Sequence, residues 1–369
     1  MAVYIHQLKG WPDFSWDQGK IAVKLAAVRH RQGRLLGRME SMVVGLQAEA
    51  HLRTLTLDVL AAGEMEGQVL DPESVRSVIA RRLGMDVAGP APGDCADPAD
   101  HTAEAIVDVM LDATRHYHAP LTRKRILGWH AALFPAHGVG AGVGDMVDPM
   151  RVGSHPSGRG KVHFQAPHAE VPEEKMTRLL IGFNRKDTLD PVVKAAIVHW
   201  WFMTIRPFEA GNGRIAGAIM DMQLSRADQT AQRFYSMSSQ IKTKRDEYYS
   251  LLERTQKTSP DLTVWLDWFL DCLDAAITST DKTLAGVLRK SRFWERHLSV
   301  PLNDRQRLML DRLLDGWEGR LTSSVWAAIT ASSQDTAGRD INDLVQRGVL
   351  RKEPAGGRST SYLLVGTGD

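Results

Sequence analysis

The chain has 369 residues, of which 43% are hydrophobic and 24% are charged, and its formal net charge is +2 at pH 7. These values are typical of a globular protein with two or three domains, and the near-neutral charge requires neither a nucleic-acid nor a membrane partner. No apolar run reaches the length of a membrane span, and we expect no signal peptide. The only cysteines are Cys95 and Cys272, which excludes a thiolate zinc site and favours a reducing, cytoplasmic location.

Residues 1–88 predict a helical N-terminal region. Two long helices are expected within residues 16–62, and a third begins at Asp71-Pro72 and ends at Gly84. Basic side chains recur along the first of these helices. We interpret them as a solvated helix face, with a binding stripe as the alternative.

The next part of the chain predicts a linker, two helices and a hairpin. Residues 87–99 are rich in proline, glycine and aspartate, and helices are expected at about 101–117 and 122–133. The glycine-rich run 138–144 lacks the spacing of a dinucleotide-binding fingerprint and is expected to be a loop. Residues 148–167 then predict a β-hairpin.

The stretch from Ala195 to Met222 organises the rest of the chain. It consists of two apolar, helix-like segments around a short loop, and Asp190 with Pro191 supplies the cap and first turn of the first segment. The Gly-Asn-Gly-Arg turn at 211–214 leads directly into the second segment. Such a turn offers free backbone N–H groups, a positive helix end and a guanidinium, which together suit a phosphate group.

The sequence of this loop resembles the signature of the Fic (Fido) family of protein nucleotidyltransferases, H-P-F-x-[D/E]-G-N-G-R-x-x-R. The residues that match in register are Pro207, Phe208, Gly211, Asn212, Gly213 and Arg214. The resemblance covers most of residues 10–300, and it implies a mainly α protein with a helical Fic core at 100–298 and a β-hairpin flap. It also implies AMP transfer from ATP to a protein hydroxyl, with a target segment bound along the flap at 148–167. The resemblance assigns nucleotide binding to Phe208, Gly211, Asn212, Gly213 and Arg214.

Three positions depart from the chemistry of that signature. Arg206 replaces the catalytic histidine, and a guanidinium cannot act as a base near neutral pH, so a factor of roughly 10²–10⁴ in rate is lost. Ala210 replaces the carboxylate that binds Mg²⁺, and Gly217 replaces the second arginine. We therefore expect no Mg²⁺ ligand from this loop. The leading hypothesis is a catalytically impaired protein that binds ATP, another nucleotide or phosphate, with an empty scaffold as the plainer alternative.

Residues 62–67 resemble the inhibitory motif [S/T]-x-x-x-E-[G/N] of N-terminally regulated Fic proteins. Glu66 and Gly67 match this motif, whereas Ala62 replaces its first residue. In the family, the glutamate pairs with the second signature arginine and blocks the γ-phosphate. Because Gly217 stands there, we expect Glu66 to lack its partner, and Glu66→Gly to leave nucleotide binding nearly unchanged.

Other histidines and the later helices complete this part of the chain. His163 and His168, near the flap, are either substrate contacts or surface histidines without a task. His199, two helical turns before Arg206, is expected to be a buried core residue. Helices are predicted at about 242–257, 261–280 and 281–297, with Leu251, Leu252, Trp265, Trp268, Phe269 and Leu273 in the core.

Residues 302–369 predict a separate module. Three helices followed by a hairpin over 302–366 resemble a winged helix-turn-helix. Its nine Lys/Arg are balanced by nine Asp/Glu, so DNA and protein partners are both kept open. The basic residues available for DNA are Arg339, Arg347, Arg351, Lys352 and Arg358.

Two further functions stay open at this level. One is an active nucleotidyltransferase with another base or donor, and the other is a transcriptional regulator in which the Fic core senses a ligand. Self-association into a homo-oligomer is also left open.

Overall fold

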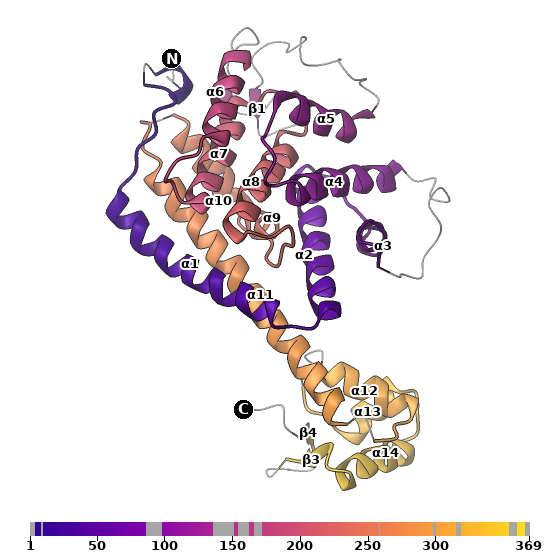
Figure 1. The fold of residues 1–369 in the computed structure, drawn as a ribbon. Helices are drawn as coiled ribbons and strands as arrows, with labels where there is room; N and C mark the ends of the chain where they lie inside the picture. The colour runs from indigo at the N-terminus through magenta and orange to yellow at the C-terminus, as the bar shows by residue number, and fades with distance from the viewer. Residues whose placement is uncertain are drawn as a thin grey trace. The chain divides into compact units, whose positions relative to one another are not determined.

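The computed structural model describes residues 4–8, 10–85, 98–135, 151–153, 162–165, 172–257, 259–297, 300–314, 319–353 and 360–365. This described part is mainly helical, as the sequence predicts (Figure 1). The chain divides into two compact units, Met1–Ser279 and Thr280–Asp369. None of the helices in the described ranges has the length and apolar character needed to cross a membrane.

The first unit begins with a short 3-10 helix and three α-helices. These are η1 (Ile5–Gln7), α1 (Gln18–Glu40), α2 (Val44–Met65) and α3 (Pro72–Arg82). Aspartates start two of them: Asp17 accepts a hydrogen bond from the Lys20 backbone N–H at 2.9 Å, and Asp71 accepts one from that of Ser74 at 2.7 Å. The helices predicted for residues 16–62 and after Asp71 are thereby confirmed.

Two helices and a two-stranded sheet follow. They are α4 (Pro98–Arg115), α5 (Arg123–Leu133), β1 (Arg151–Gly153) and β2 (Val162–Gln165). The strands are antiparallel, with Arg151 opposite Gln165 and an irregularity after Val152. The predicted hairpin is therefore present in its two strands. Three features considered from the sequence lie outside the described residues: the glycine-rich run 138–144, the side chain of His163 and all of His168.

The centre of the first unit is the pair α7 (Pro191–Ile205) and α8 (Asn212–Asp228), which lie side by side (Figure 1). Every side chain of α7 from Val192 to Ile205 is buried, so this helix forms the middle of the core. The helix α6 (Pro172–Asn184) packs against α7 and was not predicted. Its buried Met176, Leu179 and Phe183 are spaced at helical intervals, so the sequence did contain the signal.

Three more helices end the first unit and lead into the second. They are α9 (Met237–Thr243), α10 (Arg245–Thr255) and α11 (Thr263–Arg296). The helix predicted at about 242–257 is confirmed by α10, whereas the separate α9 before it was not predicted. The predicted break between 280 and 281 is wrong, because no proline interrupts the sequence and α11 is continuous there. All six core residues predicted for these helices are buried.

The second unit has its own hydrophobic core. Its elements are α12 (Asp304–Leu314), α13 (Ser323–Ile329), α14 (Gln334–Gln346) and the antiparallel strands β3 (Leu350–Lys352) and β4 (Tyr362–Leu364). Met309, Trp326, Ile341 and Leu344 are fully buried together in this core. The order of elements is the one expected for 302–366, while the winged-helix interpretation stays a prediction.

Candidate functional site

The loop between α7 and α8 is held in shape by its backbone. Arg206 ends α7 in the left-handed conformation, with φ 45° and ψ 65°, and its N–H donates to the Phe202 carbonyl at 2.9 Å. Gly211 is also left-handed, with φ 77°, and a Cβ on this residue would lie 2.5 Å from Cε2 of Phe134. Position 211 therefore requires glycine for two independent reasons.

Asn212 and Phe208 shape the loop from inside. The Asn212 side chain accepts a hydrogen bond from the Phe208 N–H at 3.1 Å and donates another to the Phe208 carbonyl. The buried Phe208 ring stacks on His130, with 4.1 Å between the ring centroids. Both side chains are committed to the loop itself. The contact with a nucleotide that the resemblance assigns to Asn212 is thus available from its backbone N–H alone.

The first turn of α8 presents its N–H groups to the carboxylate of Glu66. The helical ladder begins with the Ile215 N–H, which donates to the Gly211 carbonyl at 3.1 Å, so the N–H groups of residues 212–214 precede it. A Cβ on Gly213 would lie only 3.3 Å from Oε1 of Glu66. The Glu66 carboxylate therefore lies at the positive end of α8, where the sequence predicts an external phosphate.

Glu66 also forms an ion pair with the first signature arginine. Its Oε2 lies 3.2 Å from Nε of Arg214, whose side chain is 3% exposed. The same arginine donates through Nη2 to the side-chain carbonyl of Gln68. The expectation that Glu66 lacks a partner is thus wrong. It arose because the family motif assigns the partner to position 217, whereas Arg214 is within reach of the same carboxylate.

Burial dominates the electrostatics of this pair. It raises the pKa of Glu66, and the opposing effects of Arg214 and then Arg206 do not cancel that rise. Burial likewise lowers the pKa of Arg214, against the attraction of Glu66. Because desolvation is the largest cause on both sides, the two charges recover only part of the cost of leaving water. The Glu66 carboxylate thus occupies the position of an anionic ligand, although its burial costs free energy.

The glycine of the Glu-Gly pair has a backbone role. Gly67 has φ 79°, and its N–H donates to the Glu64 carbonyl at 3.0 Å, which closes the turn after α2. This left-handed turn lets the chain leave α2 directly after Glu66. The two residues of the predicted pair therefore act together: Gly67 ends the helix, and Glu66 lies against α8.

We call the backbone N–H groups of residues 212–214 and the Arg214 guanidinium the cradle. These residues line a pocket of about 1090 Å³. Among its lining residues are Arg206, Ala210, Arg214 and Gly217. Ala210 is exposed, and a Cβ on Gly217 would have no neighbour within 4 Å. The positions that lack their catalytic groups therefore face open space instead of being filled by other side chains.

At the signature position the loop has no Mg²⁺ ligand, although the exposed Glu209 beside it is a carboxylate that lines the same pocket. This cation needs oxygen ligands, but position 210 offers a methyl group, and the guanidiniums of Arg206 and Arg214 lie on the same pocket. The carboxylate of Glu66 is already paired with Arg214. Over the residues that the structure describes, no three carboxylate, histidine or cysteine side chains gather as a metal site.

His199 confirms the expectation of a buried core residue. Its Nδ1 lies 3.2 Å from the Ala216 carbonyl, and its Nε2 lies 3.0 Å from the Tyr248 hydroxyl. Burial lowers its pKa to about 4, so the ring is neutral at pH 7. In that state Nδ1–H donates to the carbonyl and Nε2 accepts from the tyrosine. Both ring nitrogens are therefore committed, and His199 cannot replace the missing base.

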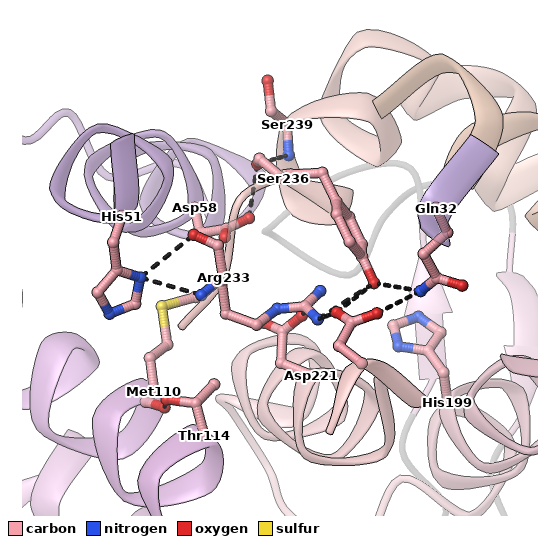
Figure 2. Close-up of polar contacts among 12 residues, drawn as sticks. Gln32, His51, Asp58, Met110, Thr114, His199, Asp221, Arg233, Ser236 and Ser239 are labelled. Atoms are coloured by element: carbon pink, nitrogen blue, oxygen red, sulfur yellow. Dashed lines mark hydrogen bonds and ion pairs between the residues drawn. The ribbon is translucent and has the colours of Figure 1, made fainter. Parts of the chain in front are cut away.

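A buried polar network that sequence reasoning missed fixes α2 and α8 relative to the chain after α8 (Figure 2). The side chain of Arg233, 1% exposed, lies 3.3 Å from an oxygen of Asp221 and 2.8 Å from one of Asp228. On the α2 side, Asp58 accepts a hydrogen bond of 2.6 Å from Ser236, which also caps α9. Burial, followed by the charge of Asp221, raises the pKa of Asp58 to about 8. Asp221, which interrupts the apolar run 215–222 of α8, was the available signal.

In the second unit, the basic residues considered for DNA fall into two groups. Arg339, Arg351 and Lys352 are exposed. Arg347 is instead held by Asp343, with 2.8 Å between Nε and Oδ1, and donates to the Pro301 carbonyl. Arg358 lies outside the described residues. The DNA and protein alternatives for this unit therefore both stay predictions.

Two parts of the chain match known protein families or domains. Residues 120–224 match the Fic/DOC family, and residues 4–85 match a domain of unknown function, DUF4172. A solved Fic family protein from Desulfovibrio desulfuricans G20 is similar at 20% identity with a TM-score of 0.51, over 94% of this chain and 97% of that one. A Fic domain containing signaling protein from Bacteroides thetaiotaomicron VPI-5482 gives 18% identity and a TM-score of 0.52, over 69% of this chain and 96% of that one. At these identities the likeness shows the fold.

Proposed function

This chain contains a Fic domain, and we propose that it is a catalytically impaired Fic protein that binds a nucleotide or phosphate group at the start of α8. The observation that carries this proposal is the Glu66 carboxylate at Gly213 and Arg214. A carboxylate and a phosphate oxygen make the same demands on backbone N–H groups and on a guanidinium. The cradle therefore keeps the geometry of an anion site, although the groups for chemistry are gone.

An external anion has to compete with Glu66 for this cradle. The chain attaches Glu66 next to α8, so its carboxylate has a high effective concentration there. A ligand gains access only by supplying more than one carboxylate can, for example the multiple charges of an oligophosphate. We therefore expect weak binding in which Arg214 and the N–H groups of 212–214 hold the anion.

Transfer of a nucleotidyl group is impaired for a separate reason. The residue at the base position, Arg206, keeps its proton near neutral pH, even though burial lowers its pKa. Among the described residues, His199 and Tyr248 do not compensate for this loss. His199 uses both ring nitrogens in the core, and burial raises the pKa of Tyr248 far from neutrality.

The test combines ATP binding with isotopic transfer. ATP is titrated into the protein in EDTA and again with Mg²⁺, and labelled ATP is then incubated with the protein and a lysate. We expect weak binding that changes little with Mg²⁺ and is lost in Arg214→Gln, and no labelling above background. Dose-dependent labelling that disappears in Arg214→Gln would instead establish an active transferase with another base. Binding that requires Mg²⁺ would place the nucleotide elsewhere.

A further inference from the structure

The half-buried Arg206 differs from Arg125, Arg214 and Arg233 in having no partner among the described residues. Arg214 pairs with Glu66, Arg233 with two aspartates, and Arg125 with Asp112 at 2.7 Å. The guanidinium of Arg206 makes no hydrogen bond or ion pair with any residue in the described ranges, and its Nε is buried without an acceptor. A half-buried charge with a buried, unpaired Nε is costly unless something compensates it.

Among the described residues, the groups around Arg206 do not compensate its charge. The groups that act electrostatically on its guanidinium are the phenols of Tyr248 and Tyr249, which burial keeps neutral, and the carboxylate of Glu66. That carboxylate is already paired with Arg214. Arg206 lines the pocket, so its free donors face a space that a ligand can enter.

We propose that Arg206 is a second anion-binding position, separate from the α8 cradle, which binds the phosphate of a phosphate monoester while Glu66 stays on Arg214. The inference rests on the proposed function in one respect, namely that this pocket receives an anionic ligand. A planar guanidinium with several donors suits a phosphate, which it binds through two parallel hydrogen bonds. Because Glu66 keeps the cradle, the ligand needs only one anionic group.

The walls of the pocket favour a nucleoside monophosphate over free phosphate. A volume of about 1090 Å³ is far larger than a phosphate ion needs. The ring of Tyr249 is 37% exposed, and the guanidinium of Arg245 lies 5.9 Å from its centroid. Apolar side chains of Met203, Ile241 and Leu252 line the same pocket. This combination offers a planar base an aromatic and apolar surface beside the Arg206 donors.

Calorimetric titrations in EDTA test the proposal with adenosine monophosphate, inorganic phosphate and adenosine as probes. In Arg206→Gln, we expect the affinity for the monophosphate and for phosphate to fall at least about tenfold, the loss typical of a charge-assisted contact. In Glu66→Gln, monophosphate affinity should rise by less than about tenfold, since that site does not use the cradle and Glu66 acts on it only through its charge. Adenosine should bind more weakly than its monophosphate. Equal affinity for phosphate and the monophosphate would still support Arg206 as the anion position and identify free phosphate as its source.

Three outcomes would overturn the proposal. They are unchanged monophosphate binding in Arg206→Gln, adenosine binding as tight as the monophosphate, and a tenfold gain of monophosphate affinity in Glu66→Gln. The two proposals fail separately, because the cradle is tested by whether ATP binds better to Glu66→Gln. If Arg206→Gln loses monophosphate binding and Glu66→Gln shows no gain for ATP, the cradle proposal fails and the Arg206 proposal stands.

Thermal unfolding distinguishes a lost contact from a damaged fold. Arg206→Gln removes an uncompensated half-buried charge at the same left-handed position, so its midpoint without ligand should equal or exceed that of the parent. Saturating monophosphate should raise the midpoint of the parent and leave that of the variant unchanged. A fall of more than about 5 °C in the unliganded variant would show that Arg206 has a structural partner, and the proposal would fail.

Discussion

At the scale of single residues, anion binding at this site depends on which arginine forms an ion pair with Glu66. The family motif assigns that role to a side chain missing at Gly217, whereas the structure places Arg214 at 3.2 Å. Arg214 is also the residue that an external phosphate requires. Glu66 and the ligand therefore compete for one guanidinium, and a change at Glu66 acts directly on binding.

Glu66→Gln should strengthen ATP binding by about tenfold or more, because it removes a negative charge from the cradle while keeping the shape of the side chain. The measurement is calorimetry in EDTA. Glu64→Gln is the matched control, because Glu64 lies two residues earlier, is 43% exposed and pairs with Lys242 outside the cradle. An unchanged affinity in Glu66→Gln would mean that ATP does not use the start of α8.

The raised pKa of Glu66 predicts stronger anion binding at acidic pH. As pH falls from 7.5 towards 5, protonation begins sooner than for an ordinary glutamate and neutralises the competing carboxylate, which faces Arg214 and Arg206. Sulfate is the suitable probe, because its own charge is constant over this range. Its affinity should rise on acidification in the parent protein and stay level in Glu66→Gln. A parallel rise in both proteins would assign the effect to another group.

Sequence reasoning identified the residues of the site but could not assign their contacts. Gly211, Arg214 and Glu66 follow from a local pattern and from general rules on helix ends. Two features could not be assigned because they depend on atoms brought together by folding. They are the hydrogen bonds of Asn212 to Phe208 and the lack of a partner for Arg206 among the described residues. A resemblance also carries the family's pairings with it, which is why it misassigned the partner of Glu66.

At the scale of elements, the cradle depends on how α2 is held against α8. Asp58 lies two turns before the end of α2, and Ser236 connects it to the start of α9. Asp221 and Asp228, on α8, share Arg233. Three carboxylates thus surround one guanidinium in the core, and a buried excess of negative charge is avoided only if a proton is retained.

Asp58→Asn should make the protein more stable, and the gain should be larger at alkaline pH than at pH 5. The pKa of Asp58 is raised from 3.8 to about 8 in the folded protein, so its stabilising contribution is complete below pH 3.8 and is lost as pH rises towards 8. Asparagine keeps an oxygen for Ser236 and has no charge to bury. Free energies of unfolding at pH 5 and 8.5 should show a gain for the variant that is larger by at least about 1 kcal/mol at the higher pH.

The exposed Asp335 provides the control for this prediction, because Asp335→Asn should shift the midpoint little at either pH. A gain for Asp58→Asn that is equal at pH 5 and 8.5 would contradict retention of a proton at Asp58.

The elements themselves were predicted where local signals are strong. Asp71-Pro72 and Asp190-Pro191 each start a helix, because a cap and a pre-set φ angle act within a few residues. The boundary between α9 and α10 at Lys244 has no glycine or proline to mark it. The buried network is equally invisible along the sequence, since its members come from α1, α2, α8 and the segment after α8.

At the scale of the whole molecule, the composition predicts the class of protein and the resemblance predicts the fold, but the chemistry depends on three positions. Arg206, Ala210 and Gly217 lie on one pocket of the first unit. At positions 210 and 217, the space that the missing side chains would need is open. The scaffold therefore retains the space that a complete signature would need.

Restoring all three groups should restore AMP transfer. Arg206→His returns a base at a left-handed position that histidine tolerates better than most residues. Ala210→Asp adds an oxygen ligand at an exposed site, and Gly217→Arg has no neighbour within 4 Å of its Cβ. Single replacements should yield nothing measurable, because groups that act as one catalytic unit recover together. The readout is Mg²⁺-dependent labelling of lysate proteins by labelled ATP.

Adding Glu66→Gly to the triple variant should raise transfer further, since Glu66 competes for Arg214 and would also meet the new arginine at 217. Adding Arg214→Gln instead should abolish transfer, and this serves as the control for contaminating enzymes. If the triple variant bound Mg·ATP but transferred nothing, the losses would extend beyond the signature to the surface that receives the acceptor. If Glu66→Gly left its activity unchanged, the ion pair with Arg214 would not limit access of the nucleotide, and the competition proposed for this cradle would be refuted.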